Sequence, residues 1–188
     1  MELNNTAALI IIDQQQGLDH PKLGQRNNSS AEIVMRELLN TWRSAGWPII
    51  HVKHRSTEPD SVFWPQQSGF EFKANFVPQD GELIIEKSIP CAILKSGLEK
   101  NLTQQSIRTL VLIGASTNNS IESTARTASN LGFKVIVVAD ACFTFAKTDY
   151  AGTARTAEEV HAMSLANLHG EYAQVMASAE LLKQVSIQ

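Results

Sequence analysis

The sequence predicts an α/β fold of the doubly wound class, with a six-stranded parallel sheet and helices on both of its faces. Two observations lead to this prediction. Short, continuous apolar runs, each long enough for one strand, alternate with longer segments that carry helix signals. A strand covered on both faces is apolar throughout, and a helix between consecutive strands makes them parallel. With 188 residues, 43% of them hydrophobic, and no linker-like stretch, the chain is predicted to be a single domain over 1–188.

Six segments carry the strand signal, which is an apolar run rich in Ile, Leu and Val between polar residues or glycine. They cover residues 6–12, 48–52, 82–86, 110–113, 133–138 and 173–176. The last of these strands is predicted at an edge of the sheet. The segment from Lys53 to Asp80, between the second and third strands, is long and irregular, which is typical of a lid or a binding loop.

Five segments carry helix signals, and they cover residues 30–45, 96–102, 120–131, 156–168 and 178–183. Candidates for the N-terminal caps are Ser30, Ser96, Thr156 and the trio Asn118, Asn119 and Ser120. Ser96 and Thr156 are each followed three residues later by Glu, which is the capping-box pattern. Gly46 and Gly132 are predicted to end the first and third helices.

Composition and motifs narrow the range of partners to a small-molecule substrate. The formal net charge of -3, without a cluster of Lys and Arg, argues against a nucleic-acid partner. No apolar run is long enough to span a bilayer and no signal peptide is present, so we expect no membrane partner and a cytoplasmic location. The phosphate-binding motifs G-x-G-x-x-G and G-x-x-x-x-G-K-[ST] are absent, and Cys91 and Cys142 lack metal-ligand spacing. We therefore expect no cofactor and no metal site.

Polar residues with chemical potential follow the predicted strands at the point where each strand ends. They are Asp13, His54, Lys87, the turn from Ser116 to Ser120, and Asp140. In doubly wound sheets, ligands bind beyond the carboxyl ends of the strands. The sequence therefore predicts that these residues, which are far apart in the chain, gather at one edge of the sheet.

A carboxylate, an ammonium group and a hydroxyl at one edge can share the work of a hydrolase. Ser120 is the candidate nucleophile, and Asp13 would take its proton and return it to the leaving group. Lys87 would keep Asp13 ionised. Backbone N–H groups around Ser116 and Ser120 would face the developing oxyanion. The alternatives are structural, with Ser120 as a helix cap and with Asp13 and Lys87 as an ion pair.

Histidines and aromatic residues leave further alternatives open. His51 and His54 are expected to serve the second strand and its exit loop, whereas His161 and His169 are expected at the surface or at an interface. The long loop carries five aromatic residues, Phe63, Trp64, Phe70, Phe72 and Phe76. They either pack the loop onto the domain or line a substrate pocket.

Three motifs, in this order and spacing, resemble the isochorismatase-like hydrolases, also called cysteine hydrolases. They are ALIIIDQQ with Asp13, EKSIPCAI with Lys87, and IGASTNNSIESTAR with Ser120. The similarity covers nearly the whole chain. It implies a Rossmann-like three-layer sandwich, a homodimer or homotetramer, and an Asp-Lys-Cys triad that cleaves C–N bonds in amides, ureides and carbamoyl compounds. It also implies a cis peptide bond between Ala115 and Ser116, beside the oxyanion site.

The chain departs from this family in carrying Ser120 where the family has its cysteine nucleophile. Thiol chemistry is therefore absent, and a hydroxyl is harder to ionise. Three explanations are open: a natural serine nucleophile, an engineered replacement of cysteine, or a reaction without a nucleophile. In the third case Asp13 would act as a general acid on a vinyl ether, as in isochorismatases proper. A non-enzymatic alternative is a catalytically weakened relative that only binds a small molecule.

The resemblance also bears on specificity. The nicotinamidase branch of the family binds a metal through Asp-x-His and a further His, and residues 52–76 lack this pattern. Nicotinamide is thus a poor candidate substrate, and no metal ligands are predicted. The predicted substrate-binding residues are Arg26, Asn27, His54, Phe63, Trp64, Phe70, Phe72 and Asn119.

Overall fold

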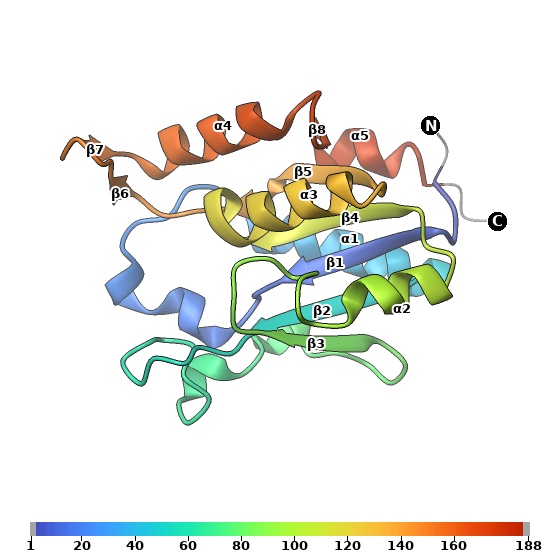
Figure 1. Cartoon of the computed structure of the whole chain (residues 1–188), viewed down its shortest axis with the longest axis horizontal. Helices are drawn as coiled ribbons and strands as arrows, with labels where there is room; N and C mark the ends of the chain where they lie inside the picture. Colours follow the sequence, from blue (N-terminus) through green and yellow to red (C-terminus); the bar gives the residue numbers. More distant parts are fainter. Residues whose placement is uncertain (1–2, 186–188) are drawn as a thin grey trace.

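A computed structural model of the chain, which describes residues 3–185, contains one six-stranded sheet in the order β3-β2-β1-β4-β5-β8 (Figure 1). The strands are β1 (Ala7–Ile12), β2 (Ile49–His54), β3 (Leu83–Lys87), β4 (Thr109–Ala115), β5 (Lys134–Phe143) and β8 (Gln174–Met176). Every neighbouring pair is parallel. The predicted fold class is confirmed, and β8 lies at the predicted edge.

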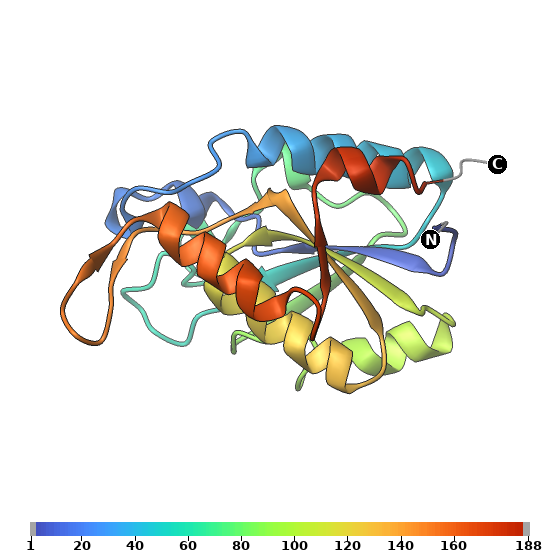
Figure 2. The same ribbon diagram turned by 90° about the horizontal axis from the view of Figure 1, so that it is seen from above.

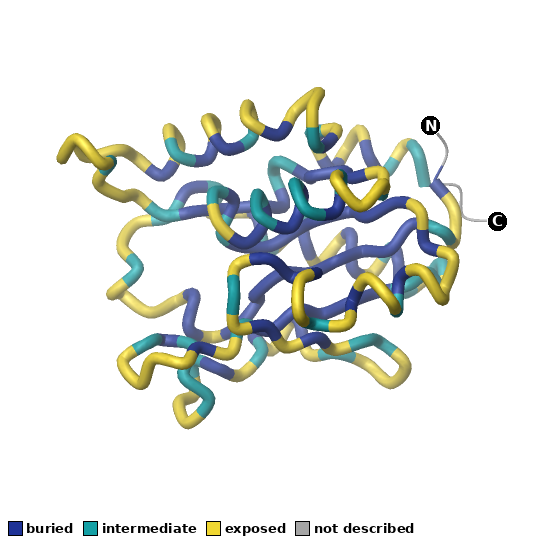
Figure 3. Tube along the Cα trace, in the orientation of Figure 1, coloured by how far each residue is buried: buried dark blue, intermediate teal, exposed yellow. Residues whose placement is uncertain are grey.

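Helices cover both faces of this sheet, as Figure 2 shows from above. They are α1 (Ala31–Ala45), α2 (Leu98–Gln104), α3 (Glu122–Asn130), α4 (Ala157–Leu168) and α5 (Ser178–Leu182). Alternate residues of β1 face opposite sides, so that Ile10 packs in one hydrophobic core and Ile11 in the other. The core of Ile10 includes Leu102 of α2, whereas the core of Ile11 includes Trp42 of α1. The sheet is therefore the buried middle layer of three, as the burial colours of Figure 3 show.

A close approach between β1 and β4 sets the position of the functional edge. Gly114 pairs with Ile12, and its φ of +124° lies in the region that favours glycine. A Cβ added at Gly114 would lie 2.2 Å from the carbonyl oxygen of Ile12. Only glycine therefore lets the end of β4 lie this close to the end of β1, directly before Asp13.

The ends of the helices differ in part from the predictions. Thr156 and Glu159 form the predicted capping box at α4. Ser30 instead has a helical backbone and makes no side-chain cap, and α2 begins after Gly97 without a capping box. Residues 118–120 do not cap α3, because they lie inside a π-helical turn, η5 (Thr117–Ile121), that leads into it. The polar side chains of this turn are thereby free for contacts outside the helix.

Several short elements were not predicted. Four 3-10 turns lie in the two long loops, η1 (Gln16–Asp19), η2 (Pro21–Leu23), η3 (Ser68–Phe70) and η4 (Ala74–Phe76). Strand β5 continues to Phe143, beyond the predicted end, after a register shift against β4. A hairpin of β6 (Lys147–Thr148) and β7 (Ala154–Arg155) projects from the body at the left of Figure 2. Within residues 3–185, no helix has the length and apolarity that a membrane span requires.

Candidate active site

The strand register brings four of the predicted residues to one edge of the sheet, whereas Asp140 lies inside β5 and accepts hydrogen bonds from Ser178 at the start of α5, which corrects the prediction for this residue. His54 at the end of β2 pairs with Lys87 at the end of β3. The backbone N–H of Asp13, just beyond β1, donates to the carbonyl oxygen of Val52 in β2. Ser120 reaches the same edge from η5, which follows β4. Parallel strands therefore place the four side chains together, as expected from their positions in the sequence.

Asp13, Lys87 and Ser120 form a closed triangle of contacts. Oδ2 of Asp13 accepts hydrogen bonds from Lys87 Nζ at 2.7 Å and from Ser120 Oγ at 2.8 Å. Lys87 Nζ also lies 3.2 Å from Ser120 Oγ. The side chain of Lys87 is fully buried and that of Asp13 is 7% exposed. One carboxylate oxygen thus contacts both the hydroxyl proton and the cation.

His54 is a fourth member of this cluster. Its Nδ1 lies 3.2 Å from Lys87 Nζ. An ammonium group has three N–H donors and no acceptor, so Nδ1 must be the acceptor and the ring proton sits on Nε2. Burial, followed by the charge of Lys87, holds the pKa of His54 below its usual value, against the opposing charge of Asp13. His54 is therefore neutral near pH 7 and completes the three acceptors around Lys87.

We expect protonation of His54 to produce an acid limb in the pH profile of activity. Protonation would place a second cation beside Lys87 and remove the Nδ1 acceptor. Because the pKa of His54 is lowered from 6.5, kcat/KM should be flat around pH 7 and should fall only below pH 6.5. In His54→Gln, whose amide oxygen can still accept from Lys87, this limb should disappear. The exposed His169→Gln is the matched control, and an unchanged limb in His54→Gln would contradict the assignment.

The second carboxylate oxygen of Asp13 has no partner among the residues that the structure describes. Oδ1 is buried, and no side chain or backbone group within residues 3–185 donates a hydrogen bond to it. A buried acceptor without a donor is costly, and such atoms in native proteins call for an explanation. Asp13 itself lines a cavity at this edge, where a bound molecule would meet its carboxylate.

This cavity has a volume of about 210 Å³ and two unlike sides. Its polar side comprises Asp13, His54, Ser116, Asn119 and Ser120, with Ala115 beside them. Its apolar side comprises Leu18, Leu23, Phe63 and Phe145. The peptide bond between Ala115 and Ser116 is cis. A small molecule in this cavity would lie against both the nucleophile and the carboxylate.

Three of the predicted substrate-binding residues line this cavity, namely His54, Phe63 and Asn119. The other five do not, so the prediction that they line the pocket is wrong for this cavity. Arg26, Asn27, Trp64, Phe70 and Phe72 lie elsewhere.

The contacts of these five residues explain their positions. Arg26 pairs with Glu32 and stacks on Phe143, and Asn27 accepts a hydrogen bond from the backbone of Thr144. Phe70 and Phe72 lie against the ammonium group of Lys53, and the half-buried Trp64 sits in the same loop. Most of the aromatic residues in the loop therefore pack the loop, which is the alternative that the sequence left open.

Leu18, Leu23 and Phe145 line the cavity but were not predicted. Leu18 and Leu23 lie in the 3-10 turns η1 and η2, inside a segment that reads as a polar loop. Phe145 follows the unpredicted extension of β5. The only signal in the sequence is the presence of isolated apolar residues in polar surroundings, which many loops share.

His161 is buried, which corrects the expectation that it lies at the surface. Its Nδ1 is 2.8 Å from Thr117 Oγ1, because α4 packs directly on η5. Ser164, one turn further along α4, lies 3.0 Å from the carbonyl oxygen of Thr117 and 2.7 Å from Glu122 Oε2. His169 is exposed, as expected. Helix α4 therefore supports the turn that carries Ser120.

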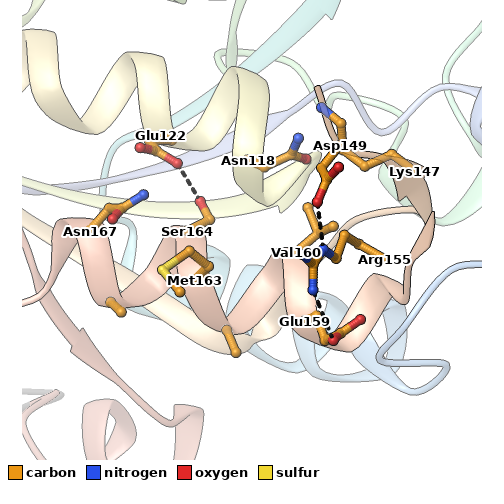
Figure 4. Close-up of a pocket in the computed structure, with 12 residues that line it drawn as sticks. Asn118, Glu122, Lys147, Asp149, Arg155, Glu159, Val160, Met163, Ser164 and Asn167 are labelled. Carbon is orange, nitrogen blue, oxygen red and sulfur yellow. Dashed lines mark hydrogen bonds and ion pairs between the residues drawn. The ribbon is translucent and has the colours of Figure 1, made fainter. Parts of the chain in front are cut away.

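A larger groove of about 860 Å³ lies on the other side of η5, between α4 and the hairpin (Figure 4). Asn118 and Glu122 line this groove, whereas Asn119 and Ser120 line the small cavity. Three charged groups of the groove form ion pairs, because Arg155 contacts both Asp149 and Glu159, as Figure 4 marks. By size alone, the groove would be the better candidate for the active site. The carboxylate, the cation and the hydroxyl that contact one another nevertheless lie at the small cavity.

The residues that the structure describes include no group of three or more His, Cys, Asp or Glu side chains placed to hold a metal ion.

The chain is similar to known proteins over most of its length. The family model described as the isochorismatase domain matches residues 7–180. An uncharacterised isochorismatase family protein of Bacillus subtilis, YrdC, is 37% identical over 93% of this chain and 94% of its own. A putative hydrolase of the isochorismatase family from Chromobacterium violaceum superposes with a TM-score of 0.94 at 45% identity, over 98% of this chain and 96% of that one. The maleamate amidohydrolase of Pseudomonas putida is 29% identical over 70% of this chain and 69% of its own.

Proposed function

The chain belongs to the isochorismatase family of hydrolases, and from this premise we propose that it is an amidohydrolase that cleaves the C–N bond of a small carboxamide or related metabolite. Asp13, Lys87 and Ser120 would carry the reaction, with no step at a metal ion. The observation that carries this proposal is the shared oxygen, Asp13 Oδ2, which contacts both the Ser120 hydroxyl and the Lys87 ammonium. A relative named for amide hydrolysis adds support.

In the first half of the reaction, Ser120 Oγ attacks the carbonyl carbon of the substrate. The Oγ–C bond forms as the hydroxyl proton passes to Asp13 Oδ2, which lies 2.8 Å away. The carbonyl electron pair moves onto the oxygen and gives a tetrahedral oxyanion. The backbone N–H groups of Ser116 and Ser120 would face this oxyanion, since those of Asn119 and Ile121 already donate to the carbonyl oxygen of Ser116.

Lys87 helps to activate the Ser120 hydroxyl, which is harder to ionise than a thiol. Its Nζ contacts both the oxygen that gives up the proton and the oxygen that takes it, so it stabilises negative charge at either one. A buried cation acts strongly here because little water screens it. His54 holds the third N–H of the ammonium and thereby fixes its direction.

In the second half, Asp13 returns the proton to the leaving nitrogen as the C–N bond breaks. The amine or ammonia departs and leaves an ester on Ser120 Oγ. Asp13 then takes a proton from a water molecule, whose oxygen attacks the ester carbonyl and releases the carboxylic acid. Ser120 recovers its proton, so that the enzyme returns to its starting state.

The test compares the Ser120 protein with Ser120→Cys and Ser120→Ala on a panel of small amides, with ammonia release and intact mass as readouts. We expect Ser120→Cys to be at least as active, because a thiolate is the better nucleophile, and to accumulate an acyl adduct on residue 120. We expect Ser120→Ala to release no ammonia.

Two other results would point to the alternatives. Full activity of Ser120→Ala would show that no nucleophile is needed and would favour Asp13 as a general acid on a vinyl ether. Binding without turnover in all three proteins would favour a relative that only binds its ligand.

The homodimer or homotetramer that the resemblance implies stays a prediction, and light scattering would measure the oligomeric state.

A further inference from the structure

We propose that the cavity is built for an electrically neutral carboxamide with a compact apolar group and that it selects against substrates that carry a carboxylate. This inference rests on the proposed function, because it names the substrate class of the same site. The charges, the unpaired atoms and the apolar wall of the cavity each support it.

The only charged side chain that lines the cavity, among the described residues, is the carboxylate of Asp13. Lys87 lies behind it with a fully buried side chain, and its three N–H groups face Asp13, Ser120 and His54. A bound molecule therefore meets a carboxylate and not an ammonium group. A ligand carboxylate would be desolvated beside Asp13, whose charge already uses the cation of Lys87, and this is unfavourable without a further cation to pair with it.

Cations on the neighbouring segments are paired with other groups. The guanidinium of Arg26, which the sequence suggested for substrate binding, contacts Glu32 and the ring of Phe143. Lys73 contacts Asp19 and the same Glu32. To bind a ligand carboxylate, either cation would have to leave a partner that it already has.

The polar side of the cavity matches the NH₂ group of an amide. Asp13 Oδ1 is buried and lacks a donor among the described residues, and it can only accept while the carboxylate is ionised. An amide N–H group in the cavity would donate to the carboxylate of Asp13, and its nitrogen would lie beside the group that returns the proton to it. A vinyl ether such as isochorismate has no N–H group and carries two carboxylates, so it fits this site poorly.

The apolar side limits the size and the character of the rest of the substrate. The apolar side chains that line the cavity offer no hydrogen bond, and they belong to Leu18, Leu23, Phe63 and Phe145. The volume of about 210 Å³ lies below the roughly 300–1,000 Å³ that is usual for drug-sized ligands. A short aliphatic or single-ring group therefore completes the predicted substrate.

The experiment measures binding of two matched probes to Ser120→Ala protein by ligand-observed NMR. Butyramide and succinamate have the same amide and the same number of carbon atoms, and they differ in a terminal methyl or carboxylate group. We expect butyramide to bind at least tenfold more tightly. Equal or tighter binding of succinamate, or no binding of butyramide, would overturn the inference.

A second variant reverses the preference. Leu23 is half-buried on η2, and Leu23→Arg would place a cation at the apolar wall, whereas Leu23→Gln is the uncharged control. We expect only the arginine variant to shift the preference toward succinamate, and no shift would contradict the electrostatic argument. If Leu23→Arg fails to fold, the ratio measured with the two probes still decides the question.

Turnover separates this inference from the proposed function. If the Ser120 protein binds butyramide preferentially but releases no ammonia from any neutral amide, the substrate class stands and the amidohydrolase proposal falls. If the protein hydrolyses succinamate faster than butyramide, the hydrolase proposal stands and the neutral substrate class falls.

Discussion

Replacing Lys87 with methionine should lower the free energy of unfolding by about 3–5 kcal/mol, the usual cost of leaving one partner of a buried ion pair alone. The fully buried Lys87 is the only cation in contact with Asp13 among the described residues, and methionine keeps most of its volume without its charge. Turnover should stop as well, because nothing would then stabilise negative charge on Ser120 Oγ. Urea unfolding followed by circular dichroism measures the first effect, and ammonia release measures the second.

A double variant tests whether the cost comes from the unpaired charge. Asp13→Asn combined with Lys87→Met removes both charges, so it should be more stable than Lys87→Met alone. Arg155→Met serves as the control, because its ion pair with Asp149 lies on the surface of the hairpin and should contribute little. If Lys87→Met is as stable as the unsubstituted protein, the ion pair of Asp13 with Lys87 does not stabilise the fold.

Replacing Asp13 with asparagine should reduce kcat/KM by roughly 10²–10⁴-fold, the range expected for removing a general base or acid. Asparagine has nearly the same shape, and its amide oxygen can still accept from Lys87 or Ser120, but it cannot take a proton. Both the nucleophilic and the vinyl-ether mechanism need this proton, so the loss does not depend on which of them operates. Steady-state kinetics at pH 7 are the measurement.

Asp149→Asn on the exposed hairpin is the matched control for this substitution, and its activity should be unchanged. The melting temperature of Asp13→Asn should be recorded alongside the kinetics, to show that the loss of activity is not a loss of folded protein. Substantial activity in folded Asp13→Asn would remove Asp13 from the mechanism altogether.

Two features could be predicted because they follow from simple rules. They are the strands of the sheet and the proximity of the candidate catalytic residues. A strand buried on two faces must be apolar, as the run from Ala7 to Ile12 is, and parallel strands end at the same edge. Asp13 and Lys87 could therefore be placed side by side although 74 residues separate them. The sheet order itself needs the connections and their packing, which local patterns do not contain.

Side-chain partners in the loops could not be predicted, because they depend on how the loops fold back. Arg26 reads equally well as a binding residue and as a partner of Glu32, and only the structure decides between them. His161 lies on a helix with an exposed outer face, and its burial depends on the packing of α4 against η5. The π-helical form of η5 likewise has no signal that distinguishes it from an ordinary cap.

The cavity draws its two sides from different kinds of structure. Asp13 and His54 sit on or directly after strands of the sheet and Ser120 sits in the turn that follows β4, whereas Leu18, Leu23, Phe63 and Phe145 all belong to connecting loops. Loops tolerate substitution and insertion far better than a buried sheet does. Substitutions at these four loop positions can therefore change the substrate specificity while the reacting atoms stay in place. One catalytic arrangement can in this way serve related enzymes that act on different substrates.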